Sequence, residues 1–258
     1  MKMLYSSDLT DSQWQVIESV FSGQRKSKTD LRAVCNALLY VVKTGCQWRM
    51  LPRQYPRWQV VYYYFQMWQS KGFIQAFQQR LTCQGRQSQG KAAHPSAAIV
   101  DAQSVKSTLV SSKQYTGYDG GKKIKGIKRT LLVDTSGHLL LCEVQPASMA
   151  DRKAGTLLTE QLKVRWPSVK KLFADGGYSL VGKAAEPLQF LNGYALEVVT
   201  VKDLARFKVL PKRWVVERNF AWLETDRRHA KSFERLPHNA KAFIEISFIK
   251  LMLNRINN

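Results

Sequence analysis

Acidic residues are scarce in this sequence of 258 residues, which has 19 Asp and Glu against 40 Lys and Arg and a formal net charge of +21. A globular protein this basic usually meets a polyanion, and nucleic acid is the most common one. A merely basic protein without such a partner is the alternative that composition leaves open. Hydrophobic residues make up 45% of the chain, which argues against an intrinsically disordered protein.

Long apolar runs are also missing. No stretch approaches the roughly 18 apolar residues of a membrane helix. The nearest one, residues 242–253, is interrupted by Glu245 and Lys250. The first residues, MKMLYSSDLTDSQW, contain no apolar segment typical of a secretory signal. We therefore expect a cytoplasmic protein with no membrane partner.

Cysteine and histidine patterns are weak. The four cysteines are scattered and form no CxxC pair, which argues against a zinc ribbon or a disulfide framework. The four histidines show no HxH or HxxxH spacing, so a histidine-based metal site is not expected. The glycine pairs at 120–121 and 176–177 match neither a Walker A loop nor a dinucleotide fingerprint, and no ATP dependence is implied.

The first part of the chain, residues 1–81, indicates a small all-helical domain. Thr10 and Gln13 form a capping-box pattern before a first apolar helix. Thr29 or Asp30 is placed to cap a second helix, and a third apolar stripe follows at helical spacing. The basic loops between these helices resemble a helix-turn-helix-like DNA-binding module in outline.

The rest of the chain differs from this helical part in composition and in the pattern of its apolar residues. Residues 82–96 are polar with glycine and proline, which is typical of a linker. Further on, two apolar runs flank a turn signal at residues 134–137. We expect a helix with the apolar positions Val181, Ala184, Leu188 and Leu191, and a long helix over residues 211–228. Mixed strands and helices predict that residues 97–258 form an α/β domain on one mixed sheet with flanking helices.

Two aspartates follow apolar runs that we expect to be strands. Asp101 closes the run at 97–100, and Asp175 closes the run at 169–174. If the strands are neighbours, both carboxylates meet at one edge of the sheet, where the sites of α/β proteins gather. An aspartate at a strand end is more often a turn residue or a helix cap. Asp151 is expected to be such a cap.

A third acid, Glu217, lies on the expected long helix. It follows Arg213 by four residues, so the two share a helix face and could simply form an ion pair. Glu224 lies on roughly the same face and is a rival candidate. A third carboxylate would complete an oxygen cage for Mg²⁺, a cation that prefers such ligands. An adjacent apolar stripe could pack the helix onto the sheet: Val216, Phe220 and Leu223.

Four segments resemble bacterial insertion-sequence DDE transposases, and the most similar group is insertion-sequence family five. They are IVDAQSVKS around Asp101, GYDGGKKIKGIKRTLLVDTSG at residues 117–137, LFADGGYS around Asp175 and RWVVERNFAWL around Glu217. LTDSQWQVIESVF, TDLRAVCNALLYVVKTGCQWRMLP and WQVVYYYFQMW look like that group's N-terminal region. Each motif is weak alone, but the ordered set covers nearly the whole chain.

The resemblance implies a ribonuclease-H-like fold whose catalytic and metal-holding residues are Asp101, Asp175 and Glu217. The implied enzyme is a metal-dependent DDE transposase. It binds the terminal inverted repeats of an insertion sequence, cleaves phosphodiester bonds at the ends and joins the 3′-hydroxyl to target DNA. Two Mg²⁺ ions are the implied cofactors, with Mn²⁺ as a substitute. The implied partners are double-stranded DNA and a second copy of the chain, as a homo-oligomer, most simply a dimer.

The family signature on the last catalytic helix, Tyr-x2-Arg-x3-Glu-x6-Lys, is half present. Arg213 and Glu217 match it, whereas Leu210 and Glu224 stand at the tyrosine and lysine positions. The alternative function is therefore a catalytically decayed, transposase-derived DNA-binding protein, and metal-dependent nicking separates the two. A further alternative is a nuclease that cuts without preference for terminal repeats and joins nothing.

Basic clusters surround the expected catalytic residues, with few acids to balance them. A solvated charged surface is the alternative interpretation of any one cluster. Phosphate contacts would position the DNA, whereas contacts to base edges would specify its sequence. The candidates for DNA binding are Lys122, Lys123, Lys125, Lys128, Arg129, Lys212, Arg213, Arg218, Arg227, Arg228 and Lys231.

Overall fold

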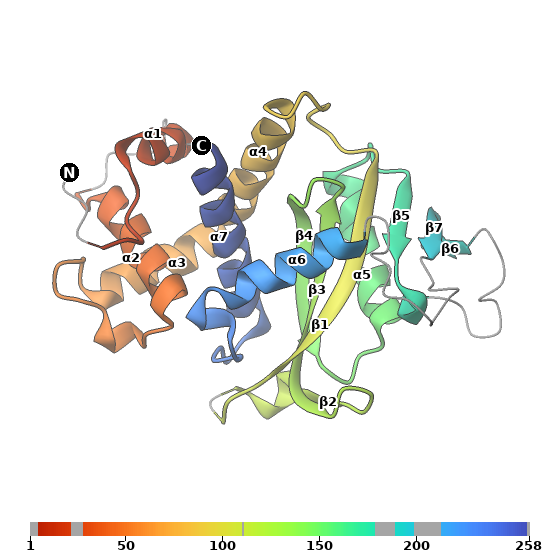
Figure 1. The fold of residues 1–258 in the computed structure, drawn as a ribbon. Helices are drawn as coiled ribbons and strands as arrows, with labels where there is room; N and C mark the ends of the chain where they lie inside the picture. The colour runs from red at the N-terminus through yellow and green to blue at the C-terminus, as the bar shows by residue number, and fades with distance from the viewer. Residues whose placement is uncertain (1–4, 22–27, 110, 179–188, 199–212, 257–258) are drawn as a thin grey trace. The chain divides into compact units, whose positions relative to one another are not determined.

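The structure is a computed structural model that describes residues 5–21, 28–109, 111–178, 189–198 and 213–256 (Figure 1). The chain divides into two compact units. One consists of Met1–Leu81, Leu223–Ala230 and Ala242–Asn258, and the other of Thr82–Trp222 and Lys231–Lys241. The last two segments of the first unit were expected in the second domain, so the chain passes between the units more often than the sequence suggests.

The first unit begins with two helices whose starts follow from their caps. At helix α1 (Asp11–Phe21), the Thr10 backbone N–H donates to Gln13 Oε1 at 3.0 Å and the Gln13 N–H donates to Thr10 Oγ1 at 3.2 Å. This reciprocal pair is the predicted capping box. Asp30 caps α2 (Leu31–Thr44) by accepting from two backbone N–H groups of the first turn. The helices therefore begin where the sequence predicts.

The core of the first unit is apolar and aromatic. It includes Val41 of α2 and Phe65 of α3, together with Phe243 of the last helix. The Phe65 and Phe243 rings stack with their centroids 4.8 Å apart, which confirms that the aromatic stripe of the third helix is core. The remaining elements of this unit are the 3-10 helix η1 (Trp48–Met50), α3 (Trp58–Ser70), η4 (Arg227–His229) and parts of α4 (Phe73–Gln87) and α7 (Pro237–Ile256).

Helix α4 changes the expected linker. Residues 82–96 were expected to be a linker, but α4 continues to Gln87, so the segment without regular structure begins only after it. The helix persists because its polar stretch still buries Leu81, Thr82 and Arg86. Burial of one face stabilises a helix whose sequence looks like a loop.

The second unit is built on one mixed sheet. Among the described residues, its strands follow the order β2-β3-β1-β5-β7-β6, and β4 pairs with β3. Strands β1, β3 and β4 are antiparallel neighbours, and β5 and β7 continue the sheet parallel to β1. This is the predicted ribonuclease-H-like arrangement. The strands are β1 (Ala97–Lys106), β2 (Gly117–Asp119), β3 (Ile124–Asp134), β4 (Leu139–Pro146), β5 (Lys171–Ala174), β6 (Gln189–Leu191) and β7 (Tyr194–Val198).

Helix α5 (Asp151–Arg165) covers one face of the sheet. Leu158 and Leu162 of α5 are fully buried with Val100 of β1, Leu132 of β3 and Leu172 of β5. Because side chains alternate along a strand, the neighbours of these residues in β1 point to the opposite face. Asp101 is one of them, so the core on the α5 face sets the orientation of the first candidate acid.

The prediction of a helix that includes Leu191 is wrong at the end that the structure describes. Leu191 lies in strand β6, which forms a hairpin with β7. Asn192 and Gly193 make the turn, with φ angles of 51° and 85°, and an Asn-Gly pair of this kind is a strong hairpin signal. Val181, Ala184 and Leu188, the other positions of that predicted helix, lie outside the described residues. The expected helix over 211–228 is described as α6 (Arg213–Glu224).

Candidate active site

The sheet brings Asp101 and Asp175 to the same level. Strands β1 and β5 pair in parallel, with Ala97 opposite Lys171 and Ile99 opposite Phe173. The same register, continued by two residues, places Asp101 opposite Asp175, which follows directly after β5. The two aspartates that the sequence singled out are therefore level on adjacent chain segments.

One detail of that prediction is wrong, because Asp101 does not close its strand. Strand β1 continues to Lys106, held by antiparallel pairing with β3 up to the pair Lys106 and Gly126. Polar residues after Asp101 obscured this, since a partner strand can extend a strand beyond its apolar run. Pairing with β5 stops at Ile99. Asp101 consequently lies just beyond the paired part of β1 and β5, at the end of β5 where α/β sheets hold their ligands.

Both carboxylates are oriented by local backbone hydrogen bonds. Asp101 Oδ1 accepts from the backbone N–H of Ala102 at 2.7 Å, and Asp175 Oδ1 accepts from the backbone N–H of Gly177 at 3.0 Å. Each aspartate is partly exposed. An ionised carboxylate offers about four acceptor positions, and each of these bonds uses one of them.

A third carboxylate near this edge, Asp151, was expected only to cap a helix. It is the first residue of α5, and the cap position is held by Ala150. A Cβ atom at Gly177 would lie 3.2 Å from Asp175 Oδ1 and 3.3 Å from Asp151 Oδ2, so the two carboxylates face the same glycine. Asp151 also forms an ion pair with the buried Lys128. Its proximity to Asp175 had no sequence signal, because it depends on the packing of α5.

Tyr178 lies behind these acids with its side chain fully buried. Its hydroxyl has no hydrogen-bond partner among the described residues. Burial raises the pKa of Tyr178 well above its ordinary value, and the negative charges of Asp101, Asp151 and Asp175 raise it further. The phenol therefore remains protonated and can donate a hydrogen bond throughout the physiological range.

The third predicted acid, Glu217, is exposed on α6. The predicted apolar stripe on this helix is confirmed, because Val216, Phe220 and Leu223 are buried. Within the described ranges, however, no group of three His, Cys, Asp or Glu is placed to hold a metal ion. The carboxylate chemistry of Asp101 and Asp175 suits a hard divalent cation, but Glu217 does not complete a ligand set with them in this conformation.

The position of α6 is set by the turn between β3 and β4. Gly137 in this turn has φ of 87°, and a Cβ atom there would lie 3.1 Å from Arg218 Nη2 and 3.3 Å from Val215 Cγ1. Arg218 Nη2 donates to the backbone carbonyl of Ser136 at 3.3 Å. Only glycine combines this backbone angle with so close an approach. The helix that carries Glu217 is thus docked against this turn.

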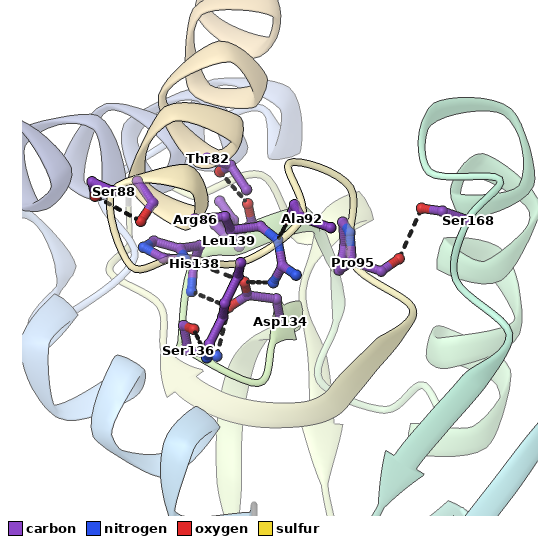
Figure 2. A network of polar contacts seen from close by, with 12 residues as sticks. Thr82, Arg86, Ser88, Ala92, Pro95, Asp134, Ser136, His138, Leu139 and Ser168 are labelled. Carbon is purple, nitrogen blue, oxygen red and sulfur yellow. Dashed lines mark hydrogen bonds and ion pairs between the residues drawn. The ribbon is translucent and has the colours of Figure 1, made fainter.

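A buried polar network fixes the turn in its place (Figure 2). The Asp134 carboxylate pairs with Arg86 of α4 and with His138 Nδ1, the latter at 3.2 Å. Its Oδ1 accepts from the backbone N–H groups of Ser136 and His138, both at 2.8 Å. Lys91 Nζ donates to Ser136 Oγ at 2.6 Å. The support of α6 is consequently linked to the end of α4.

Arg218 has a stacking role that the sequence did not indicate. Its guanidinium lies 4.5 Å from the ring centroid of Trp214 and 4.4 Å from that of Trp222. Burial lowers the pKa of Arg218 below its ordinary value, and cation–π contacts of this kind stabilise a partly desolvated guanidinium. Arg218 was a candidate for DNA binding, but its observed contacts are to Trp214, Trp222 and Ser136.

Three other candidates for DNA binding are buried. Lys128 pairs with Asp151 and donates to the carbonyl of Met149 at 2.6 Å. Arg129 donates to Gln103 Oε1 at 2.7 Å, and Arg228 donates to the carbonyl of Cys46 at 3.0 Å. Such burial does not favour contact with DNA phosphates in this conformation, and their assignment to DNA binding stays a prediction. Each cation satisfies groups of the protein interior instead.

The other basic candidates fall into two groups. Those with exposed side chains remain suited to phosphate contact, and the tip between β2 and β3 holds Lys122 and Lys123, with Lys125 at the start of β3. Arg227 and Lys231 are exposed as well. Lys212 lies outside the described residues, and for Arg213 only the backbone is described.

Comparisons with known proteins agree with this geometry. Residues 9–78 match a family model described as "Putative transposase of IS4/5 family", and residues 92–253 match the model described as "Transposase DDE domain". No curated protein and no solved structure matches the chain. No helix in the described parts is long and apolar enough to cross a membrane. Since the second model spans more than half of the sequence, the chain belongs to the DDE transposases of the IS4/5 type.

Proposed function

We propose that this transposase binds the terminal inverted repeats of an insertion sequence, cleaves the phosphodiester bonds at the ends and joins the freed 3′-hydroxyl to target DNA. The observation that carries the proposal is the parallel pairing of β1 and β5, whose register, continued by two residues, brings Asp101 and Asp175 level. They stand where pairing between β1 and β5 stops, at the kind of edge where α/β sheets bind ligands. Two carboxylates at that edge suit metal-assisted chemistry on a phosphodiester.

In this proposal Asp101 and Asp175 hold divalent cations, with Mg²⁺ as the natural ion and Mn²⁺ as a substitute. The chemistry that bound cations supply is activation of the attacking water or 3′-hydroxyl and stabilisation of the leaving oxygen. Glu217 is the proposed third ligand. In the described parts of the chain no group of three such side chains is placed to hold a metal ion, so the ligand role of Glu217 stays a prediction.

The proposed role of the exposed basic residues is to hold the DNA backbone. Lys122, Lys123 and Lys125 are exposed around the same hairpin tip. The Lys122 backbone N–H donates to Asp119 Oδ1 at 3.0 Å, which fixes the tip on its strand. Lys212 and Arg213 stay proposed contacts as well. A homodimer acting on two paired DNA ends belongs to this proposal.

The test is cleavage of DNA that carries the ends flanking the gene, with Mg²⁺, with Mn²⁺ and with EDTA. We expect nicking that requires a cation and that falls by at least about a thousandfold in Asp101→Asn or Asp175→Asn, while DNA binding persists. Loss of an essential electrostatic group commonly costs this much. Glu217→Gln should behave in the same way if the third ligand is assigned correctly.

The matched control is Asp11→Asn, which neutralises an exposed aspartate that pairs with Arg32 far from the sheet in sequence. It should cleave like the unaltered chain. Wild-type nicking by an Asp101 or Asp175 variant would remove that residue from the site. Specific binding to the ends without cleavage under any cation would instead support the binding-only alternative, and Glu224→Lys with Leu210→Tyr would then be the restoring variant to examine.

A further inference from the structure

Tyr178 packs its ring in the core, but its buried hydroxyl makes no hydrogen bond with the described residues. Its exposed fraction is 0% and its hydroxyl finds no hydrogen-bond partner in the described parts of the chain. Buried hydroxyl groups are satisfied in most proteins, and an exception in a native structure calls for an explanation. A phenylalanine would fill the same space without leaving a polar atom unpaired.

Packing holds the Tyr178 ring in one place. A Cβ atom at Gly155 of α5 would lie 2.7 Å from the ring atom Cε1 and 3.4 Å from Leu191, so α5 carries a glycine where the ring crosses it. The Tyr178 backbone N–H donates to the Asp175 carbonyl at 3.2 Å, and its carbonyl accepts from Arg152. The ring is thus anchored to α5 and to the turn after β5.

The same packing holds the Tyr178 ring close to the candidate site. Gly155 and Asp151 are four residues apart on α5 and therefore share a helix face. Cε1, the ring atom next to the hydroxyl-bearing carbon, touches Gly155, and Asp151 lies one turn away beside Gly177 and Asp175. The charges of Asp101, Asp151 and Asp175 all act on the Tyr178 hydroxyl. The ring that carries the unpaired hydroxyl thus lies near these three carboxylates.

Lys128 explains how so many acids coexist here. Its buried ammonium forms an ion pair with Asp151, which offsets one of the three negative charges. Asp101 and Asp175 are the two carboxylates that the proposed function assigns to divalent cations. A bound cation is the group that would draw these two carboxylates together, and carboxylates that hold metals usually accept hydrogen bonds from neighbouring donors.

We propose that Tyr178 is a positioning residue of the Asp101 and Asp175 site, whose hydroxyl donates a hydrogen bond to one of these carboxylates when a divalent cation binds. This inference rests on the proposed function, because it takes the two aspartates as the cation ligands. Tyr178 acts through the carboxylate and touches neither DNA nor cation.

The experiment compares the full-length chain with Tyr178→Phe and with Tyr118→Phe, whose tyrosine is exposed on β2. Mn²⁺ binding is measured by electron paramagnetic resonance, without DNA, and the melting temperature is recorded for each protein. We expect Tyr178→Phe to weaken Mn²⁺ binding by about tenfold to a hundredfold, as removal of such outer partners does elsewhere. Its melting temperature should be unchanged or higher, because only an unpaired hydroxyl is removed.

A second readout follows the tyrosine absorption during an Mg²⁺ titration. The unaltered chain and Tyr118→Phe should show a difference spectrum that Tyr178→Phe lacks. Equal Mn²⁺ affinity for Tyr178→Phe and the unaltered chain would overturn the assignment of Tyr178 while leaving the proposed function intact. Mn²⁺ binding that persists in Asp101→Asn, or no binding by the unaltered chain, would overturn both.

Discussion

Asp134 shows at the residue scale how a buried charge can be kept. Its carboxylate has no exposed surface, yet it is surrounded by Arg86, His138 and two backbone N–H groups (Figure 2). Burial alone would raise the pKa of Asp134, but hydrogen bonds and charge from His138, together with the bond from Arg86, lower it to about 2. The folded protein therefore favours the ionised carboxylate.

The lowered pKa of Asp134 predicts acid sensitivity. A carboxyl whose pKa falls from 3.8 to about 2 on folding contributes stability that is present above pH 3.8 and lost as the pH falls toward 2. The contribution is on the order of 2 kcal/mol. Asp134→Asn leaves Arg86 without its charge partner, so we expect it to unfold about 3–5 kcal/mol more easily near neutral pH. Urea denaturation at a series of pH values measures both.

The prediction concerns the difference in unfolding free energy between the unaltered chain and Asp134→Asn. Between pH 5 and pH 2 this gap should narrow, because the unaltered chain loses a stabilising contribution that the variant never had. Asp11→Asn, at an exposed ion pair, is the comparison and should show a much smaller gap at neutral pH. A gap for Asp134→Asn that stays constant down to pH 2 would show that Asp134 is not the titrating group.

At the scale of elements, helix α6 depends on one glycine. Gly137 has φ of 87°, and a Cβ atom there would lie 3.1 Å from Arg218 Nη2 and 3.3 Å from Val215 Cγ1 of α6, so these side chains would have to shift by a few tenths of an ångström. Gly193, in the turn between β6 and β7, has a similar φ of 85°, but nothing lies within 4 Å of its Cβ position. Comparing the same substitution at the two glycines therefore distinguishes backbone strain, which both variants share, from displacement of α6, which only the Gly137 variant causes.

We expect Gly137→Ala to be more harmful than Gly193→Ala. Both variants place alanine at a positive φ, which costs on the order of 1–2 kcal/mol in unfolding free energy. Only Gly137→Ala also pushes against Arg218, which stacks between Trp214 and Trp222. Denaturant unfolding and tryptophan fluorescence of the folded state measure the two effects. The spectrum should change only in Gly137→Ala, and identical spectra and stabilities in the two variants would contradict docking through this turn.

The features of the helices and strands that the sequence predicted well are those set by local interactions. The capping box at Thr10 and Gln13, the cap at Asp30 and the turn ahead of β4 each depend on a few neighbouring residues. Such patterns carry their own physical cause. The position of Asp175 directly after a short apolar strand belongs to the same class.

Tertiary packing decided what the sequence could not predict. Strand β1 passes beyond Asp101 because β3 pairs with it as far as Lys106, and α4 extends because its polar face is buried. Asp151 and Tyr178 reach the candidate site only through the packing of α5 against the turn after β5. None of these features has a local sequence signature, since each depends on a partner distant in the chain.

On the scale of the whole molecule, the 40 basic residues outnumber the 19 acidic ones, and some of the basic side chains lie in the interior instead of on the surface. Lys128, Arg129 and Arg228 satisfy buried acceptors, and Arg218 stacks between indoles. Net charge still steers a polyanion toward the protein. However, only basic residues that remain exposed can neutralise phosphates, so their number and place should determine how strongly salt weakens DNA binding.

The salt dependence of DNA binding tests this distinction. If roughly eight phosphates are neutralised, the logarithm of the binding constant should fall with the logarithm of the salt concentration with a slope of about −7. Removing the hairpin lysines by Lys122→Gln, Lys123→Gln and Lys125→Gln should make the slope less negative by about 2.5–3, because each lost contact releases about 0.9 fewer counterions. Fluorescence anisotropy with terminal DNA over a salt series gives both slopes.

The matched control removes the same charge from other exposed lysines, as Lys153→Gln, Lys163→Gln and Lys170→Gln. If contact at the hairpin tip matters, the control keeps nearly the original slope, because counterion release counts phosphates that are actually neutralised. An equal change in both triple variants would mean that DNA senses only the net charge. In that case the position of the lysines around β2 and β3 would carry no information about the path of the DNA, and a slope near zero in the unaltered chain would contradict phosphate contact altogether.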